Sequence, residues 1–193
     1  MKKVFKLAFV ALATLSLGSM MTSCDEENGI ISIIKNLLNP GETYTYTGTA
    51  ASQSLTGSYD KEEWYRINDK DSQFSNMQVT LKSTQTDATI TIPAFTDGKV
   101  SVSATTIGRL TQTLNEEKTL TTLGIDMSTT TINGTITVDG TTYTIRNLYF
   151  EKAAATTTSL ELAITLYYST DSDGDDYSKA INFTYTGTAP AAE

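Results

Sequence analysis

Three aspartates stand at alternate positions in the acidic stretch DSDGDD. Asp171, Asp173 and Asp175 match the first, third and fifth positions of a loop that wraps calcium with hard oxygen ligands. Two positions depart from that loop: glycine comes fourth instead of sixth, and Asn182 stands twelfth in place of a bidentate glutamate. Two interpretations therefore remain open, a calcium site and an acidic hairpin loop.

Histidine is absent, and the chain has one cysteine. The commonest general base, the usual zinc ligands and every nucleophile that depends on histidine are therefore missing. Acid–base chemistry by carboxylates needs two acids on one face, but the neighbours Glu62 and Glu63 would point to opposite faces of a strand. We expect no enzymatic activity and no cofactor.

Aromatic residues are the remaining candidates for ligand contacts. Trp64 and Tyr65 lie among charged residues in DKEEWYRIND, and an aromatic platform with a polar rim is how many sugar and peptide sites are built. The alternative is a tryptophan that closes one end of the fold. Inward tyrosines of the predicted strands either fill the core or line a cavity with their hydroxyls. They are Tyr44, Tyr46, Tyr143 and Tyr168.

The one cysteine, Cys24, follows a segment with the layout of a secretory signal. The first six residues carry three lysines and no acid, and the apolar run after them is too short to span a membrane. Small residues precede the cysteine in MMTSC, which resembles the cleavage site of bacterial lipoproteins. We predict lipidation of Cys24 and anchoring to a membrane, because each buried acyl CH₂ contributes about 0.8 kcal/mol. The alternative is an ordinary secretory signal with an unpaired thiol.

Three acids, Asp25, Glu26 and Glu27, come directly after the cysteine. This arrangement resembles the export signal that some gut-dwelling Gram-negative bacteria use to send lipoproteins to the cell exterior. A solvated acidic tether on the periplasmic side is the alternative. We expect a lipid-anchored protein of the outer membrane that faces the exterior.

Length and charge limit the remaining partners. Residues 24–193 are enough for one domain with a core of its own. Three of the 14 basic residues lie in the leader, so 11 remain against 22 acids, a net charge of −11. Such a charge repels nucleic acid. We therefore expect no nucleic-acid partner. For a barrel that binds a ligand, we also expect a monomer.

The elements that must position these residues are strands. From Thr43 onward, apolar residues and threonines alternate with the period of half-buried strands. Asp139 and Gly140 supply the positive φ angles of a type I′ hairpin turn, and Pro93 indicates an edge, a bend or a bulge. The predicted inward residues are Tyr44, Tyr46, Gly48, Val79, Leu81, Ile90, Ile92, Val100, Val102, Ala104, Ile132, Ile136, Val138, Tyr143, Ile145, Leu160, Leu162, Ile164, Leu166, Tyr168, Ile181, Phe183 and Tyr185.

The pattern predicts an all-β fold with an antiparallel barrel of about eight to ten strands, the number at which a sheet closes around side chains or one small ligand. A β-sandwich is the alternative. The segment GIISIIKNLLNPGE, closed by Pro40 and Gly41, predicts a short helix packed on the barrel. The expected organisation is a signal peptide (1–23), a tether with the helix (24–42), the barrel (43–188) and a tail (189–193).

The order of these segments resembles the calycin-like β-barrel lipoproteins of gut bacteria, a lipocalin-shaped family. The likeness covers about residues 43–188 and consists of YTGT, QVTLKS, TITIPAF, the INGTITV to TYTIRN hairpin and INFTYTG. It implies a fold and a location but no site residues. Lipid-binding lipocalins open with Gly-x-Trp where this chain has Tyr-Thr-Gly, so the ligand type is not carried over.

These observations favour a binding protein over an enzyme. We expect the mouth of the barrel to bind a small lipid, a glycan or a peptide. The alternative is a structural or adhesive β-sandwich subunit of a cell-envelope assembly.

Overall fold

The chain divides into two units, Met1–Ile34 and Lys35–Glu193. A computed structural model describes part of the second unit, residues 38–58, 63–68, 70–114, 116, 120–168 and 178–190. The predicted signal peptide, Cys24, the acids after it and the aspartates of the predicted calcium loop lie outside these residues. So does most of the predicted short helix, of which Leu38 is described and packs against the core. Within the described residues, no helix has the length and apolar character needed to cross a membrane.

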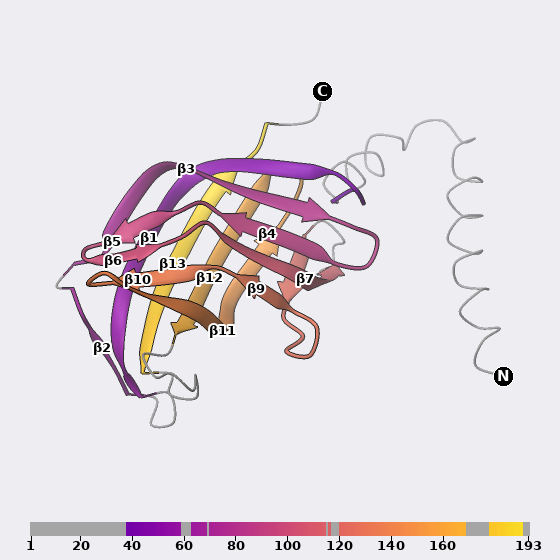
Figure 1. Cartoon of the computed structure of the whole chain (residues 1–193). Coiled ribbons are helices and arrows are strands. Elements are labelled where there is room, and N and C mark those ends of the chain that lie inside the picture. The colour runs from indigo at the N-terminus through magenta and orange to yellow at the C-terminus, as the bar shows by residue number, and fades with distance from the viewer. Residues whose placement is uncertain are drawn as a thin grey trace, which may run out of the picture. The chain divides into compact units, whose positions relative to one another are not determined.

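Antiparallel strands make up almost all of the described chain (Figure 1). Their bounds are β1 Thr43–Ser58, β2 Glu63–Arg66, β3 Ser72–Ser83, β4 Ala88–Ile92, β5 Phe95–Asp97, β6 Val100–Val102, β7 Thr105–Leu114, β8 Thr121–Gly124, β9 Thr131–Asn133, β10 Thr135–Val138, β11 Thr141–Ala155, β12 Ser159–Tyr168 and β13 Lys179–Thr188.

Eight of these strands close into a barrel. Hydrogen bonding runs in the order β12, β13, β1, β3, β4, β7, β8 and β11, and β11 pairs with β12 to complete the ring. The predicted antiparallel barrel is therefore confirmed. Each strand of the ring has a neighbour on both sides, which leaves no long unpaired edge in it.

One long, bent hairpin extends the barrel wall at one end. Two short irregular segments interrupt the strands of this hairpin: Pro93 and Ala94 separate β4 from β5, and Ser103 and Ala104 separate β6 from β7. The β5–β6 pair therefore continues the β4–β7 pair. The proline thus marks a bend, as predicted, whereas Ala104 is exposed instead of inward. Next to β6, β10 pairs with β11 through a turn with φ of 47° at Asp139 and 83° at Gly140, as predicted for type I′.

The core fills the barrel with the predicted inward residues. Most of them are buried, and the half-buried ones are Tyr44, Gly48, Ile132, Val138 and Tyr143. Two buried tyrosines link strands by hydrogen bonds from their hydroxyl groups to backbone carbonyl oxygens. The Tyr185 hydroxyl donates to the carbonyl oxygen of Tyr46 at 2.7 Å, and the Tyr46 hydroxyl donates to that of Thr156 at 2.5 Å. Gly187 and Gly48 pair on β13 and β1 beside these bonds, and a methyl group on Gly187 would collide with the Tyr185 hydroxyl.

Candidate ligand site at the barrel mouth

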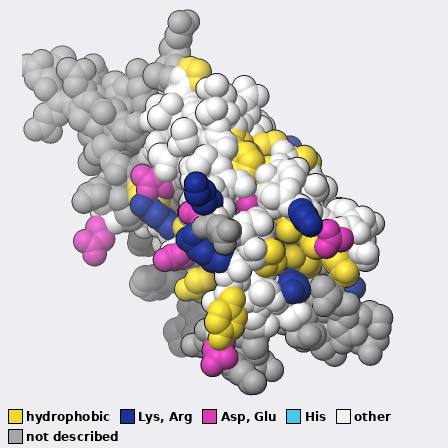
Figure 2. Space-filling view, turned by 90° about the vertical axis from the view of Figure 1, so that its left-hand side faces the viewer, with side chains coloured by type: hydrophobic (Ala, Val, Ile, Leu, Met, Phe, Trp, Pro, Cys, Tyr) yellow, Lys and Arg dark blue, Asp and Glu magenta, His cyan; other side chains and the backbone are white. Residues whose placement is uncertain are grey.

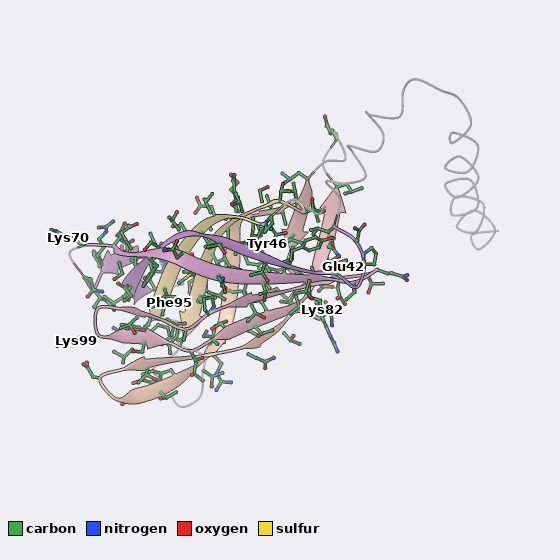
Figure 3. All side chains as sticks on the ribbon, turned by 90° about the horizontal axis from the view of Figure 1, so that it is seen from above. Glu42, Tyr46, Lys70, Lys82, Phe95 and Lys99 are labelled. Carbon is green, nitrogen blue, oxygen red and sulfur yellow. The ribbon has the colours of Figure 1, made fainter. Side chains whose placement is uncertain are left out.

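The mouth, as we define it, is the end of the barrel at which β1 and β12 end and β13 begins. The β2 strand and the β5–β6 hairpin also lie at this end, on the left of Figure 1. In Figure 3, Lys70 and Lys99 lie together at this end, whereas Glu42 and Lys82 lie at the opposite end. Figure 2 looks onto the mouth, where basic side chains stand among acids and hydrophobic residues.

A row of side chains leads from the core to the solvent at the mouth. The strand registers join Ile145 to Tyr168, Tyr168 to Lys179, Lys179 to Thr56, and Thr56 to Tyr65. Residues in one row of a sheet point to the same face, which here is the interior face. Along this mouth row, Ile145 and Tyr168 are buried, Lys179 and Thr56 are half-buried, and Tyr65 is 64% exposed.

Tyr168 is the most unusual residue of the mouth row. It is fully buried, its ring lies 5.8 Å from that of Tyr143, and its hydroxyl has no hydrogen-bond partner among the described residues. Burial, helped by the neighbouring Tyr143, raises the pKa of the Tyr168 phenol to about 12. The phenol therefore stays protonated at neutral pH and can donate one hydrogen bond.

Lys179 brings a positive charge to the same place. Its ammonium Nζ donates to the Thr56 hydroxyl at 2.7 Å, and the side chain is half-buried. An ammonium group has three protons to donate, so this bond uses one of them. The mouth row thus places two donor side chains on the adjacent strands β12 and β13, with the Tyr143 ring against Tyr168 and with Tyr65 at the exposed end of the row.

A buried carboxylate, Asp97, closes the wall beside this row. Its Oδ2 accepts from the Ser54 hydroxyl at 2.5 Å, and its Oδ1 accepts from the Ser72 hydroxyl at 2.6 Å and from Asn68 Nδ2 at 3.2 Å. These bonds tie the tip of the β5–β6 hairpin to β1 and β3. The next residue, Gly98, has φ of 62°, and a methyl group there would press on the Asn68 side chain.

Sequence reasoning missed Asp97 because TDGK has the composition of a solvated turn. One signal was present: Asp97 lies two residues after Phe95, so the alternation of the strand places both on the inward face. The inward serines Ser52 and Ser54 were missed in the same way, because no inward residue was predicted between Gly48 and Val79. Ser52 is buried, and its hydroxyl has no partner among the described residues.

The aromatic residues predicted to bind ligand fall into three groups. Tyr143 and Tyr168 are in ring contact at the mouth, and Tyr65 lies at the exposed end of the mouth row. Trp64 points to the other face of β2, where its ring lies 5.7 Å from that of Tyr167. The remaining pair belongs to the opposite end of the barrel.

In that pair, Tyr44 accepts a hydrogen bond from the backbone N–H of Asn39 at 2.8 Å. Burial, with the neighbouring Tyr44 and Tyr185, raises the pKa of the Tyr46 phenol well above its usual value. Tyr46 is fully buried and hydrogen-bonded, so it fills the core.

Among the described residues, no group of three or more His, Cys, Asp or Glu side chains is placed to hold a metal ion. The predicted calcium ligands Asp171, Asp173 and Asp175 lie outside those residues. No protein-family model, curated protein or solved structure matches the chain. The function is therefore argued from the geometry of the mouth.

Proposed function

We propose that this chain is a membrane-anchored binding protein that takes a small carboxylate with an apolar body, such as a lipid-derived acid, at the mouth of its barrel. The observation that carries the proposal is the buried Tyr168 hydroxyl, which has no partner among the described residues, on a residue that pairs across the strands with Lys179. A buried donor without a partner costs about 1–3 kcal/mol. A ligand oxygen at this position would satisfy it.

The chemistry of the mouth supports a ligand with one acceptor group. Both side chains donate, and a carboxylate accepts from an ammonium and a phenol at the same time. Large side chains such as Tyr46, Phe183 and Leu160 fill the barrel behind the mouth, which favours a short ligand body lying against Tyr143 and Tyr65.

Hexanoate is a suitable probe, with hexanamide as the neutral control of equal shape. We expect hexanoate to raise the melting temperature of the protein, because a ligand that binds only the folded state stabilises it. Lys179→Met should weaken binding about 10- to 100-fold, because it removes a hydrogen bond between charged groups. Tyr168→Phe should weaken binding about fivefold, because it removes the hydrogen bond of the phenol. Isothermal titration calorimetry measures both.

Lys152→Met is the matched control, because Lys152 pairs with Glu161 on the outer face of the barrel. This variant should bind hexanoate as the wild type does. Equal affinity of the wild type and Lys179→Met, or equal affinity for hexanoate and hexanamide, would contradict the proposal.

The anchor of this binding protein is Cys24 in our proposal, with the acids 25–27 directing the domain to the exterior of the outer membrane. The lipobox-like sequence MMTSC supports this, as does the order of strands that resembles calycin-like lipoproteins. Cells fed an alkyne-tagged fatty acid should label the wild-type protein, and Cys24→Ser should abolish both the label and membrane association. Labelling that survives in Cys24→Ser would show that the anchor is elsewhere.

The alternative role, a structural subunit of an envelope assembly, has less support. Such subunits associate through exposed strand edges. In the described part of the chain, the strands outside the closed ring are short, with three or four residues each. A binding role for a monomer fits these short edges better.

A further inference from the structure

We propose that the outer face of β12, β13 and β1 binds an uncharged oligosaccharide along a track that begins at Trp64 and Tyr167. This track lies on the opposite side of the barrel wall from the mouth row. It therefore makes a second site, independent of the carboxylate proposal.

The track begins at an aromatic platform. The rings of Trp64 and Tyr167 lie 5.7 Å apart with an angle of 49° between their planes. Beneath them, Leu55 and Ala180 share a row with Tyr167 and so face outward, yet they are only 8% and 0% exposed. Their burial on the outside of a barrel indicates that the aromatic rings cover them. Half-buried rings over an apolar floor are the surfaces on which the apolar faces of sugar rings stack.

A polar row follows the platform along the strands. Thr165, Asn182 and Gln53 are paired across β12, β13 and β1, and the Thr165 hydroxyl donates to Asn182 Oδ1 at 2.9 Å. Gln53 Nε2 donates to Asp71 Oδ1 at 2.9 Å, and Asp71 also pairs with Arg66 at 3.2 Å. Planar amides both donate and accept, so they match the hydroxyl groups of a sugar.

A shallow groove of about 290 Å³ continues in the same direction. Small side chains, Ala51 and Thr184, lie within it, and Gln73 stands on one side with the Lys152–Glu161 ion pair on the other. The strand pairing here is regular from the platform to the far end of the groove, without a bulge. Six residues of strand separate the two ends, a length of about 20 Å. The track is therefore long enough for several sugar units.

The paired charges of the track argue against an ionic ligand, and its fully paired strands argue against an extended peptide. Its basic residues Arg66 and Lys152 are each paired with an acid, so the track offers no excess charge to an ionic ligand. An extended peptide would need an open strand edge, but β12, β13 and β1 have neighbours on both sides over this length. The track therefore offers aromatic rings for stacking and side-chain amides for hydrogen bonds. An uncharged chain rich in hydroxyl groups, such as an oligosaccharide, matches both.

Neutral hexasaccharides of β-1,4-glucan, β-1,4-xylan and α-1,4-glucan are the probes, titrated into the purified protein by calorimetry. We expect at least one of them to bind, and Trp64→Ala to weaken its binding about tenfold or more, since stacking contributes on the order of 1–3 kcal/mol. Met127→Ala removes an exposed apolar side chain between β8 and β9, away from the track, and should leave affinity unchanged. Gln53→Ala should weaken binding about fivefold through the lost hydrogen bond.

If Trp64→Ala does not fold, Gln53→Ala and Trp64→Leu still test the proposal, because leucine keeps an apolar side chain but has no ring on which a sugar can stack. Lys179→Met removes the positive charge of the mouth row and should not change saccharide affinity. The proposals for the mouth and for the track can therefore fail independently of each other. Absence of binding by all three hexasaccharides at millimolar concentration would overturn the proposal. So would wild-type affinity in both Gln53→Ala and a folded Trp64 variant.

Discussion

Replacing Phe183 by alanine should lower the free energy of unfolding by about 4 kcal/mol, as for other buried phenylalanines. Phe183 is fully buried, and its ring stacks on that of Phe95 with centroids 5.1 Å apart. Phe95 in turn packs edge-on against Phe74 at 5.4 Å. Loss of the Phe183 ring would leave a cavity beside the ring of Phe95, where the β5–β6 hairpin rests on the barrel. Urea unfolding followed by circular dichroism measures the change.

The melting temperature should fall by about 12 °C in the same variant, given the unfolding entropy of a domain of this size. Tyr149→Ala is the control, because Tyr149 is 60% exposed and its loss should change stability by less than about 0.5 kcal/mol. A loss below about 1 kcal/mol in Phe183→Ala would show that this ring is not part of a packed core.

Replacing Asp97 by alanine should lower the free energy of unfolding by about 3 kcal/mol. The carboxylate is fully buried and accepts bonds from Ser54, Ser72 and Asn68. Alanine would leave these donors without a partner, at a cost of about 1–3 kcal/mol for each group that water does not reach. Because these bonds tie the β5–β6 hairpin to β1 and β3, hydrogen exchange at the backbone amides of the hairpin should also speed up.

Two further substitutions separate the hydrogen bonds of Asp97 from its packing. Asp97→Asn keeps the size and one acceptor oxygen, so its loss of stability should fall between those of the wild type and Asp97→Ala. Thr96→Ala changes an exposed neighbour on the same strand and should have almost no effect. Equal stability of Asp97→Ala and Thr96→Ala would mean that the hairpin is held without the carboxylate.

The barrel was predictable because alternation is a strong signal where one face of a strand is apolar. Leu160 to Tyr168 on β12 and Ile181 to Tyr185 on β13 show it without interruption, and Asp139-Gly140 marks its turn by backbone chemistry alone. The signal fails where small polar residues face inward. Ser52 and Ser54 continue the inward face of β1 past Gly48, the last inward residue predicted in this strand.

The site was only partly predictable, because strand register brings together residues that are distant in sequence. Tyr168 and Tyr65 were singled out as aromatic residues, but their row with Lys179 depends on pairings between β12, β13, β1 and β2. Nothing in the local sequence of Lys179 distinguishes it from a surface lysine. Trp64 and Tyr65 were expected to act together, and they lie on opposite faces because neighbours on a strand alternate.

The mouth is tested most directly by nuclear magnetic resonance of the ¹⁵N-labelled protein during titration with hexanoate. Our account predicts that the backbone amide signals that shift belong to the mouth row, above all Tyr168, Lys179 and Thr56, while those of Tyr44 and Leu38 at the opposite end stay in place. Shifts confined to the opposite end, or no shifts at millimolar hexanoate, would contradict it.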